Sequence, residues 1–254
     1  MRILYVSRVL SIHDYRILKK LTLSGYQVLL FSMERPIIPK NITELSGIKF
    51  VNYNRPRPRT DYRYYLSFQS IIIAIEHTFF RFIEKLGLRE KVFSEQTIFS
   101  HSIFRFFYYS KKLLNEIKDF KPDLIHAGYT SNDGFLAGIT DFKPVLQMPW
   151  GSDILVDPNL SDSLLERTRF VLNRACRIYC DCEEVKKTIL KISDFQADKI
   201  DVFPMLGIDL KRFNPNRKNP KIIERIGWND KRIIIMTRTF NPIYGINYFI
   251  MALP

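Results

Sequence analysis

Polar residues follow two strand-like segments of the sequence. His126 lies near the end of the segment DLIHAG, and Gly151, Ser152 and Asp153 come directly after PVLQMPW. A glycine allows close approach to the backbone, while a hydroxyl and a carboxylate bind hydroxyl-rich ligands such as sugars. We therefore take Gly151, Ser152 and Asp153 as candidate substrate-binding residues, with Asp153 and His126 as candidates for a catalytic role. Two plainer interpretations stay open: Asp153 caps a helix or turn, and His126 is a structural histidine.

The segments that carry these residues alternate with helical patterns. Strands are expected over residues 2–7, 26–32, 48–54, 123–128, 144–150, 177–182 and 199–204. Helices are expected over residues 14–24, from about 133, over 161–174 and over 183–192. Uninterrupted apolar strands that alternate with helices indicate a parallel sheet covered on both faces. The pattern predicts an α/β fold with a doubly wound, Rossmann-like sheet over residues 1–204, whose ligands bind at the carboxyl ends of the strands.

Residues 55–120 interrupt this alternation with a basic and aromatic insert. The arginine-rich stretch RPRPRTDYRYY is expected to be a loop, and helical patterns follow over residues 66–86 and 100–120. The segment FRFFYY, Phe104–Tyr109, has too many aromatic residues for one helix face to bury. It belongs either to a helix packed between layers or to a basic–aromatic membrane interface. The nearby basic residues are Arg81, Lys85, Arg89, Lys91, Arg105, Lys111 and Lys112.

The last fifty residues begin a second unit. Residues 205–230 are polar and rich in Pro and Asn, as in an interdomain linker. A strand is expected over residues 231–237, followed by a helix from Gly245. A lone strand–helix unit buries its apolar face poorly. We therefore expect Ile233, Ile234, Phe249 and Ile250 either to be partly exposed or to be buried against the first domain.

Composition narrows the class of protein further. The 254 residues carry a net charge of +13, which favours anionic partners such as nucleotide phosphates or an anionic membrane surface. The basic residues are scattered and no nucleic-acid recognition motif is present, so a nucleic-acid partner is not expected. The start of the chain is not a signal peptide, and Tyr64–Ile75 is too short to span a membrane. A cytoplasmic location is expected, and a peripheral position at the inner face of the membrane stays open.

The sequence lacks the motifs of several common enzyme classes. No glycine follows the first strand where a dinucleotide fingerprint would lie, and the sequence has no P-loop, zinc-protease motif or G-x-S-x-G elbow. Cys176, Cys180 and Cys182 have no fourth ligand nearby. We interpret them as buried strand cysteines in a reducing compartment, with Cys180 and Cys182 on one strand face, and expect no metal and no cofactor.

Five segments, in order, resemble the family 4 ("group 1") retaining glycosyltransferases, which have the two-domain GT-B architecture. They are DLIHAGYTSNDGFLAG, PWGSDIL, CDCEEVKKTI, DKIDVFPMLGIDLKRFNP and TRTFNPIYGINYFIMALP. The resemblance covers most of residues 123–254. It implies that residues 1–204 form the acceptor-side domain and that residues 231–254 are the truncated start of the donor-binding domain.

The resemblance also implies a reaction. A sugar would pass from a nucleotide-sugar to an acceptor hydroxyl with retention and without a required metal, in polysaccharide or glycolipid synthesis. Arg238 matches the family arginine that contacts the donor diphosphate, a role suited to a guanidinium. The family's glutamate pair, which grips the donor, does not occur in these 254 residues. We therefore expect this chain alone to be inactive and to need a C-terminal half.

Some positions depart from the family pattern. Trp150 replaces the histidine before the glycine, and Tyr244 replaces a lysine that would contact phosphate. Leu206 stands where the family has asparagine. These departures leave two alternatives open: a non-catalytic basic α/β module that binds a membrane surface, and another GT-B enzyme such as a sugar-nucleotide epimerase.

Overall fold

A computed structural model shows a parallel α/β sheet with helices on both faces. It describes residues 1–7, 12–32, 40–51, 95–204, 207–211, 213–217, 219–228, 231–240 and 244–253. The chain divides into two compact units, Met1–Leu206 and Gly207–Pro254. Each unit is described by itself.

The first unit contains the sheet. Its strands are β1 (Arg2–Val6), β2 (Gln27–Phe31), β3 (Ile48–Phe50), β4 (Leu124–Ala127), β5 (Val145–Gln147), β6 (Arg177–Cys180) and β7 (Ile200–Val202). They are parallel and lie in the order β3-β2-β1-β4-β5-β6-β7. All seven agree with expected strands, and the doubly wound, Rossmann-like prediction is confirmed. Because the order reverses between β1 and β4, ligands are expected to bind near the carboxyl ends of these two strands.

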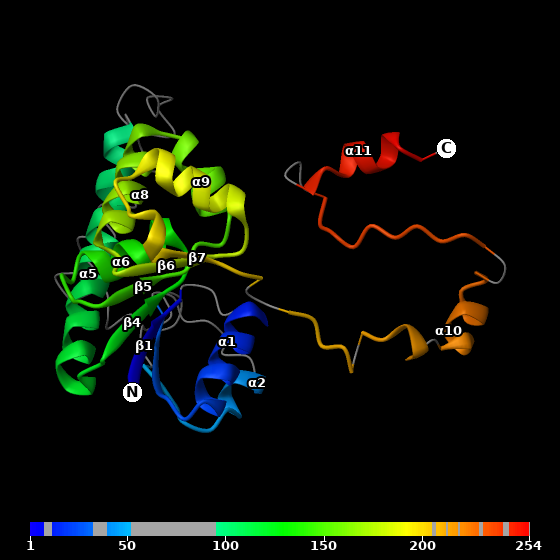
Figure 1. The fold of residues 1–254 in the computed structure, drawn as a ribbon, viewed down its shortest axis with the longest axis horizontal. Helices are drawn as coiled ribbons and strands as arrows, with labels where there is room; N and C mark the ends of the chain where they lie inside the picture. The colour runs from blue at the N-terminus through cyan, green and yellow to red at the C-terminus, as the bar shows by residue number, and fades with distance from the viewer. Residues whose placement is uncertain are drawn as a thin grey trace, which may run out of the picture. The chain divides into compact units, whose positions relative to one another are not determined.

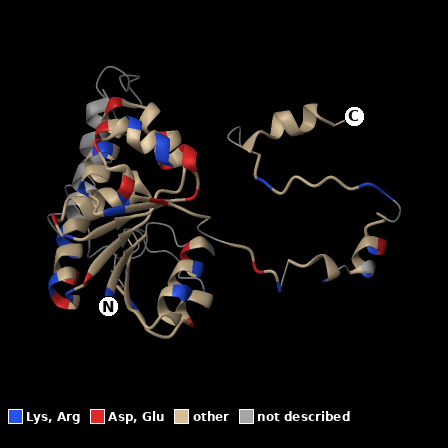
Figure 2. Ribbon diagram, in the orientation of Figure 1, with Lys and Arg blue, Asp and Glu red and all other residues tan. Residues whose placement is uncertain are grey.

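Helices cover the sheet from both sides. They are α1 (Ile12–Leu23), α2 (Lys40–Thr43), α5 (Glu95–Phe120), α6 (Phe135–Gly138), α7 (Ser152–Leu155), α8 (Asp162–Arg174) and α9 (Glu183–Ile192). Helices α1 and α2 lie on one side of the sheet, and α8 and α9 lie on the other (Figure 1). Charged residues lie mainly on the helices, and the strands carry few of them (Figure 2). Strands enclosed on both faces explain the continuous apolar runs in the sequence.

Among the described residues, the core is made of three apolar clusters. Leu4, Phe31 and Ile125 pack against α5 and α6, while Tyr5, Leu30 and Met148 pack with Leu18 of α1 on the other side. The third cluster joins β6 and β7 to α7, α8 and α9 through Ile154, Leu172, Ile178, Val185, Ile189 and Ile200. This packing fixes the strand ends that carry the candidate site.

The aromatic segment of the insert is partly explained by α5. Phe106 and Tyr109 are buried in the cluster that packs on the sheet, which agrees with a helix packed between layers. The arginine-rich loop and the helix predicted over residues 66–86 lie outside the described residues. So do the basic residues Arg81, Lys85, Arg89 and Lys91 and the side chain of Arg105. In the part of the chain that the structure describes, no helix is both long and apolar enough to cross a membrane.

The second unit differs from the sequence prediction in two respects: a helix lies within the predicted linker 205–230, and one predicted strand does not form. Its helices are α10 (Pro220–Arg225) and α11 (Ile246–Met251), and α11 begins after Gly245 as expected. The strand expected over residues 231–237 is wrong, because these residues form neither strand nor helix. A strand needs a neighbour to bond its backbone, and the described residues of this unit contain none.

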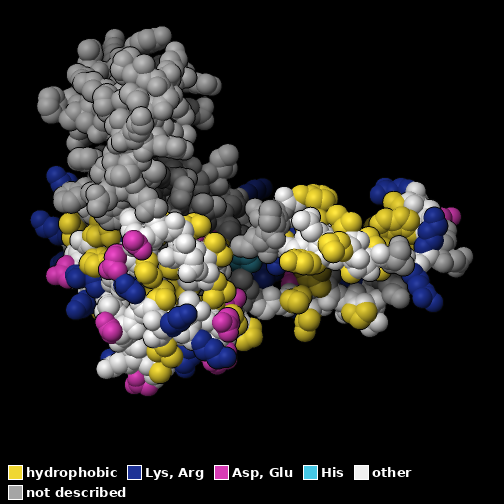
Figure 3. Space-filling view, turned by 90° about the horizontal axis from the view of Figure 1, so that it is seen from above, with side chains coloured by type: hydrophobic (Ala, Val, Ile, Leu, Met, Phe, Trp, Pro, Cys, Tyr) yellow, Lys and Arg dark blue, Asp and Glu magenta, His cyan; other side chains and the backbone are white. Residues whose placement is uncertain are grey.

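The apolar residues of the second unit remain exposed, as predicted. Ile233, Ile234 and Ile250 have exposed fractions of 41%, 66% and 55%, and Phe249 is half-buried. Hydrophobic side chains are prominent on the described surface of this unit (Figure 3). The described residues of this unit therefore include strand-forming and helix-forming types but form no apolar core cluster of their own.

Candidate functional site

The candidate residues gather where β4 and β5 end. The two strands pair directly, with His126 opposite Leu146 and Ala127 opposite Gln147. The loops that follow them carry Tyr129 and Thr130 on one side and Trp150, Gly151 and Ser152 on the other. Strand β4 is also the strand that pairs with β1, so these loops flank the point where the strand order reverses.

A short π-helix, Thr130–Gly134, follows β4. The Asp133 carboxylate accepts the Tyr129 N–H at 3.0 Å and holds the start of this turn. A side chain at Gly128 would come within 3.0 Å of the same carboxylate, which explains the glycine. Single π-helical turns occur frequently at functional sites, so this turn marks the β4 end of the site.

Asp153 joins the two loops. Its side chain is fully buried, Oδ2 accepts the Thr130 N–H at 2.7 Å and Oδ1 accepts the Trp150 N–H at 2.8 Å. Burial raises the pKa of this carboxyl to about 6, despite the hydrogen bonds that lower it. The carboxylate thus stabilises the loops, in line with the plainer interpretation, and would act on a ligand through the backbone that it positions.

Two hydroxyl groups of these loops are polar and only half-buried. The Tyr129 hydroxyl lies 3.3 Å from the Ser152 Oγ, and both residues are half-buried. Burial raises the pKa of Tyr129 to about 12, so this hydroxyl keeps its proton near neutral pH. Neutral hydroxyls both donate and accept hydrogen bonds, which suits recognition of a hydroxyl-rich ligand.

Gly151 has a backbone conformation that only glycine adopts readily. Its φ of 95° and ψ of −66° lie in a region that strains residues with a side chain. No atom lies within 4 Å of the place that a Cβ would occupy. The constraint is therefore conformational and not steric.

We expect Gly151→Ala to lower the free energy of unfolding of the first unit by roughly 1–3 kcal/mol, the usual cost of such strain. Urea denaturation followed by Trp150 fluorescence, in a Trp228→Phe background, measures the loss. Ser163→Ala in α8 is the control, with an expected change within about 0.5 kcal/mol. Equal stability of Gly151→Ala and the parent protein would contradict the assignment.

His126 is buried among aromatic rings. Its ring centroid lies 4.9 Å from Tyr5 and 5.6 Å from Tyr179, and its Nε2 is 3.0 Å from the Tyr179 hydroxyl. Burial lowers the pKa of His126 to about 4, so the imidazole is neutral near pH 7. This environment agrees with the structural interpretation of His126.

Two buried residues that the sequence analysis did not select support the site. Gln147 is fully buried, and its Nε2 donates to the Gly128 carbonyl and to Thr130 Oγ1. Arg167 places its guanidinium 5.2 Å from the ring centre of Phe106 and 4.8 Å from that of Phe135. A polar residue within an apolar strand, as in VLQM, is the signal that would have identified Gln147.

Arg238 lies in the second unit. It is exposed, and its guanidinium carbon is 5.0 Å from the ring centre of Tyr244. Tyr244 therefore holds the arginine by a cation–π contact. Such stacking leaves the planar N–H groups of the guanidinium available for a phosphate.

The cysteines differ from expectation. Cys180 is buried at the end of β6, but Cys176 and Cys182 are exposed. The prediction that Cys180 and Cys182 share a strand face is wrong, because the strand ends at Cys180 and Cys182 is the N-cap of α9. Among the described residues, no three His, Cys, Asp or Glu side chains are grouped as metal ligands.

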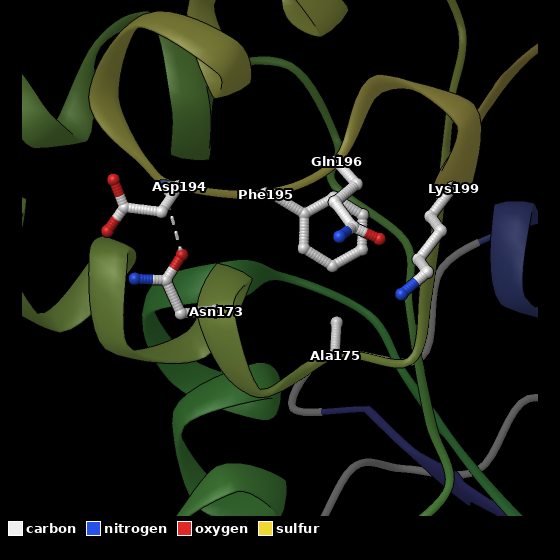
Figure 4. Close-up of a pocket in the computed structure, with 6 residues that line it drawn as sticks. All are labelled: Asn173, Ala175, Asp194, Phe195, Gln196 and Lys199. Carbon is white, nitrogen blue, oxygen red and sulfur yellow. Dashed lines mark hydrogen bonds between the residues drawn. The ribbon is translucent and has the colours of Figure 1, made fainter.

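An open pocket of about 340 Å³ lies away from these loops. It is lined by Asn173, Ala175, Asp194, Phe195, Gln196 and Lys199 (Figure 4). Ala175 and Lys199 come just before β6 and β7, so the pocket lies at the amino edge of the sheet. The candidate site is at the opposite edge.

Comparison with known proteins relates this region to glycosyltransferases. Residues 85–182, which include His126 and Gly151–Asp153, match the family model described as Glycosyl transferase 4-like. Comparison with curated sequences gave no significant match. The region is thus similar to this family, and the match ends before Arg238.

Solved structures share the fold. Anabaena Alr3699/HepE in complex with UDP-glucose matches with a TM-score of 0.55 and 13% identity, over 92% of this chain and 54% of that one. The same protein in complex with UDP matches with a TM-score of 0.52 and 13% identity, over 89% and 50%. A Neisseria meningitidis UDP-GlcNAc 2-epimerase gives a TM-score of 0.48 and 15% identity, over 80% and 45%. This chain spans about half the length of these structures.

Proposed function

We propose that this chain is the acceptor-side portion of a retaining glycosyltransferase with GT-B architecture. The enzyme would transfer a sugar from a nucleotide-sugar to an acceptor hydroxyl, in polysaccharide or glycolipid synthesis. The observation that carries the proposal is that the glycosyltransferase 4-like region contains the loops after β4 and β5. Those loops present the hydroxyls of Tyr129 and Ser152, joined by the buried Asp153.

The proposed roles combine the geometry of the two loops with the resemblance at Arg238. Ser152 and Tyr129 would bind acceptor hydroxyls, Gly151 would let the sugar approach the backbone, and Asp153 would hold both loops in place. Arg238 would contact the diphosphate, where a guanidinium stabilises charge on the leaving group. The reaction as proposed requires no metal and no cofactor besides the nucleotide-sugar substrate.

We extend the proposal to the location of the enzyme and to the donor-binding half that would complete it. A net charge of +13 favours a peripheral position on an anionic membrane surface at the cytoplasmic side. Because the chain spans about half of the matched structures, a donor-binding half would complete the enzyme. We therefore expect the 254-residue chain alone to transfer no sugar.

Transfer of sugar from UDP-glucose and other nucleotide-sugars to glycan acceptors tests the function. It is measured in a protein that joins this chain to a donor-binding half, and the anomeric configuration of the product is read by NMR. Retained configuration is expected. Inversion, or failure to consume any nucleotide-sugar, would reject the proposal, and turnover by the 254-residue chain alone would reject the need for a second half.

In that protein, Arg238→Ala should raise the KM for the nucleotide-sugar about tenfold, the size of one lost charge-assisted hydrogen bond. Arg238→Lys should recover part of the loss. Arg232→Ala, an exposed arginine in the same unit, is the matched control and should leave KM unchanged. An unchanged KM in Arg238→Ala would remove Arg238 from the donor site.

A further inference from the structure

Four aromatic rings form a continuous row across one face of the sheet. Tyr5 contacts His126 at 4.9 Å between ring centres, His126 contacts Tyr179 at 5.6 Å, and Tyr179 contacts Phe203 at 5.1 Å. The row begins at Tyr5, which is fully buried, and ends at Phe203, which is 47% exposed. Its outer end thus presents an aromatic surface to solvent.

The outer pair is stacked and held in place. The rings of Tyr179 and Phe203 are nearly parallel, with an interplanar angle of 5°. The Phe203 N–H donates to the Cys180 carbonyl at 3.0 Å, which continues the sheet pairing past the end of β7. The Tyr179 hydroxyl lies 3.0 Å from His126 Nε2. Because both rings are fixed before any ligand arrives, binding to them costs little ordering entropy.

Polar groups lie beside this stack on the same face. Tyr179 pairs with Asp201 in the sheet register, and side chains two residues apart on a strand share a face. Arg177 and Asp201 therefore lie next to Tyr179 and Phe203, and they form a two-bond ion pair that is about half exposed. The result is a patch with a flat aromatic part and a polar part that donates and accepts hydrogen bonds.

We propose that Tyr179 and Phe203 form a ring-stacking subsite for a pyranose ring of the acceptor glycan, with Arg177 and Asp201 at its polar rim. The assignment of that glycan as the acceptor rests on the proposed function. The subsite lies at the carboxyl edge of the sheet, on β6 and just after β7.

The chemistry of the patch favours a sugar. The face of an aromatic ring carries negative potential, and the C–H face of a pyranose offers the weakly positive, apolar surface that complements it. The hydroxyls at the rim of the same sugar ring need hydrogen-bond partners, which a carboxylate and a guanidinium provide. A nucleobase stacks on the same aromatic face but presents no ring of hydroxyls.

The test uses the 254-residue chain and saturation-transfer NMR with maltotriose, cellotriose and chitotriose as probes, and with UDP in a separate arm. We expect at least one trisaccharide to bind with saturation concentrated on the C–H protons of one ring. Phe203→Ala should weaken its binding at least fivefold, while Phe203→Tyr should retain it. Phe213→Ala, an exposed phenylalanine of the second unit, is the matched control and should bind as the parent chain does.

The other outcomes overturn the inference. If no trisaccharide binds, or if Phe203→Ala binds as tightly as the parent chain, the aromatic pair is no sugar subsite. If Phe203→Ala loses UDP binding instead, the platform takes a nucleobase. Sugar binding does not depend on turnover, so a protein that binds glycans through Phe203 but transfers no sugar would reject the proposed function and keep the subsite. Sugar transfer whose acceptor KM is unaffected by Phe203→Ala would keep the proposed function and reject the subsite.

Discussion

Replacing Asp153 by alanine is expected to lower the free energy of unfolding of the first unit by about 2–6 kcal/mol at pH 5. The Asp153 carboxyl accepts the backbone N–H groups of Thr130 and Trp150 and is fully buried. The substitution leaves both donors without their acceptor, at about 1–3 kcal/mol each. The loss should be smaller at pH 7. At that pH the wild-type protein is itself destabilised by ionisation of the buried Asp153 carboxyl, a cost that the variant does not have.

Urea denaturation in the Trp228→Phe background measures this loss, because Trp150 then reports on the loop that Asp153 holds. Asp198→Ala is the matched control, since Asp198 is exposed and its removal should change stability by less than about 0.5 kcal/mol. Asp153→Asn, which keeps one acceptor oxygen, should lose less than Asp153→Ala. If Asp153→Ala is as stable as the control, the carboxyl does not join the two loops.

The sheet could be predicted from the sequence because its signals are local. Runs such as RILYV and QVLLF are apolar throughout, and Gly25, at a φ of 78°, ends the helix between them. Parallel strands buried on both faces leave this pattern whatever their neighbours are. The carboxyl-edge position of His126 and of Gly151–Asp153 followed from the same reasoning.

The prediction of a strand over residues 231–237 was wrong because strand-forming side chains are not sufficient to form a strand. Ile233, Ile234 and Ile235 have the side chains of a strand, but a strand forms only when another strand bonds its backbone. Secondary-structure propensity in a sheet depends on that context. The sequence of the segment alone therefore could not decide its structure.

The roles within the site could not be predicted because they depend on contacts between distant segments. Asp153 accepts a hydrogen bond from Thr130, twenty-three positions earlier. His126 meets Tyr179, fifty-three positions later. Residue type indicated chemistry at both positions. Burial and these contacts determine that the Asp153 carboxyl joins two loops and that the His126 imidazole is neutral.

The opposite pKa shifts of Asp153 and His126 should produce opposite pH dependences of stability. The pKa of Asp153 is about 6 in the folded protein and near 3.9 when unfolded. Between these values the folded protein holds a proton that the unfolded chain has lost, so raising the pH lowers stability by about 3 kcal/mol. The pKa of His126 is about 4 when folded and near 6.5 when unfolded. Here the unfolded chain holds the extra proton, so raising the pH increases stability by about 3 kcal/mol.

The two contributions cancel in the wild-type protein, and single variants should reveal them. Between pH 3 and pH 7.5, the stability of Asp153→Asn relative to wild type should rise by about 3 kcal/mol, while that of His126→Gln should fall by about the same amount. Denaturation at half-unit pH intervals measures both slopes. The double variant is the control, and its pH dependence should match wild type because the contributions of two separate sites add. If either single variant has the same pH dependence of stability as wild type, burial does not shift the pKa of the corresponding side chain in the folded protein.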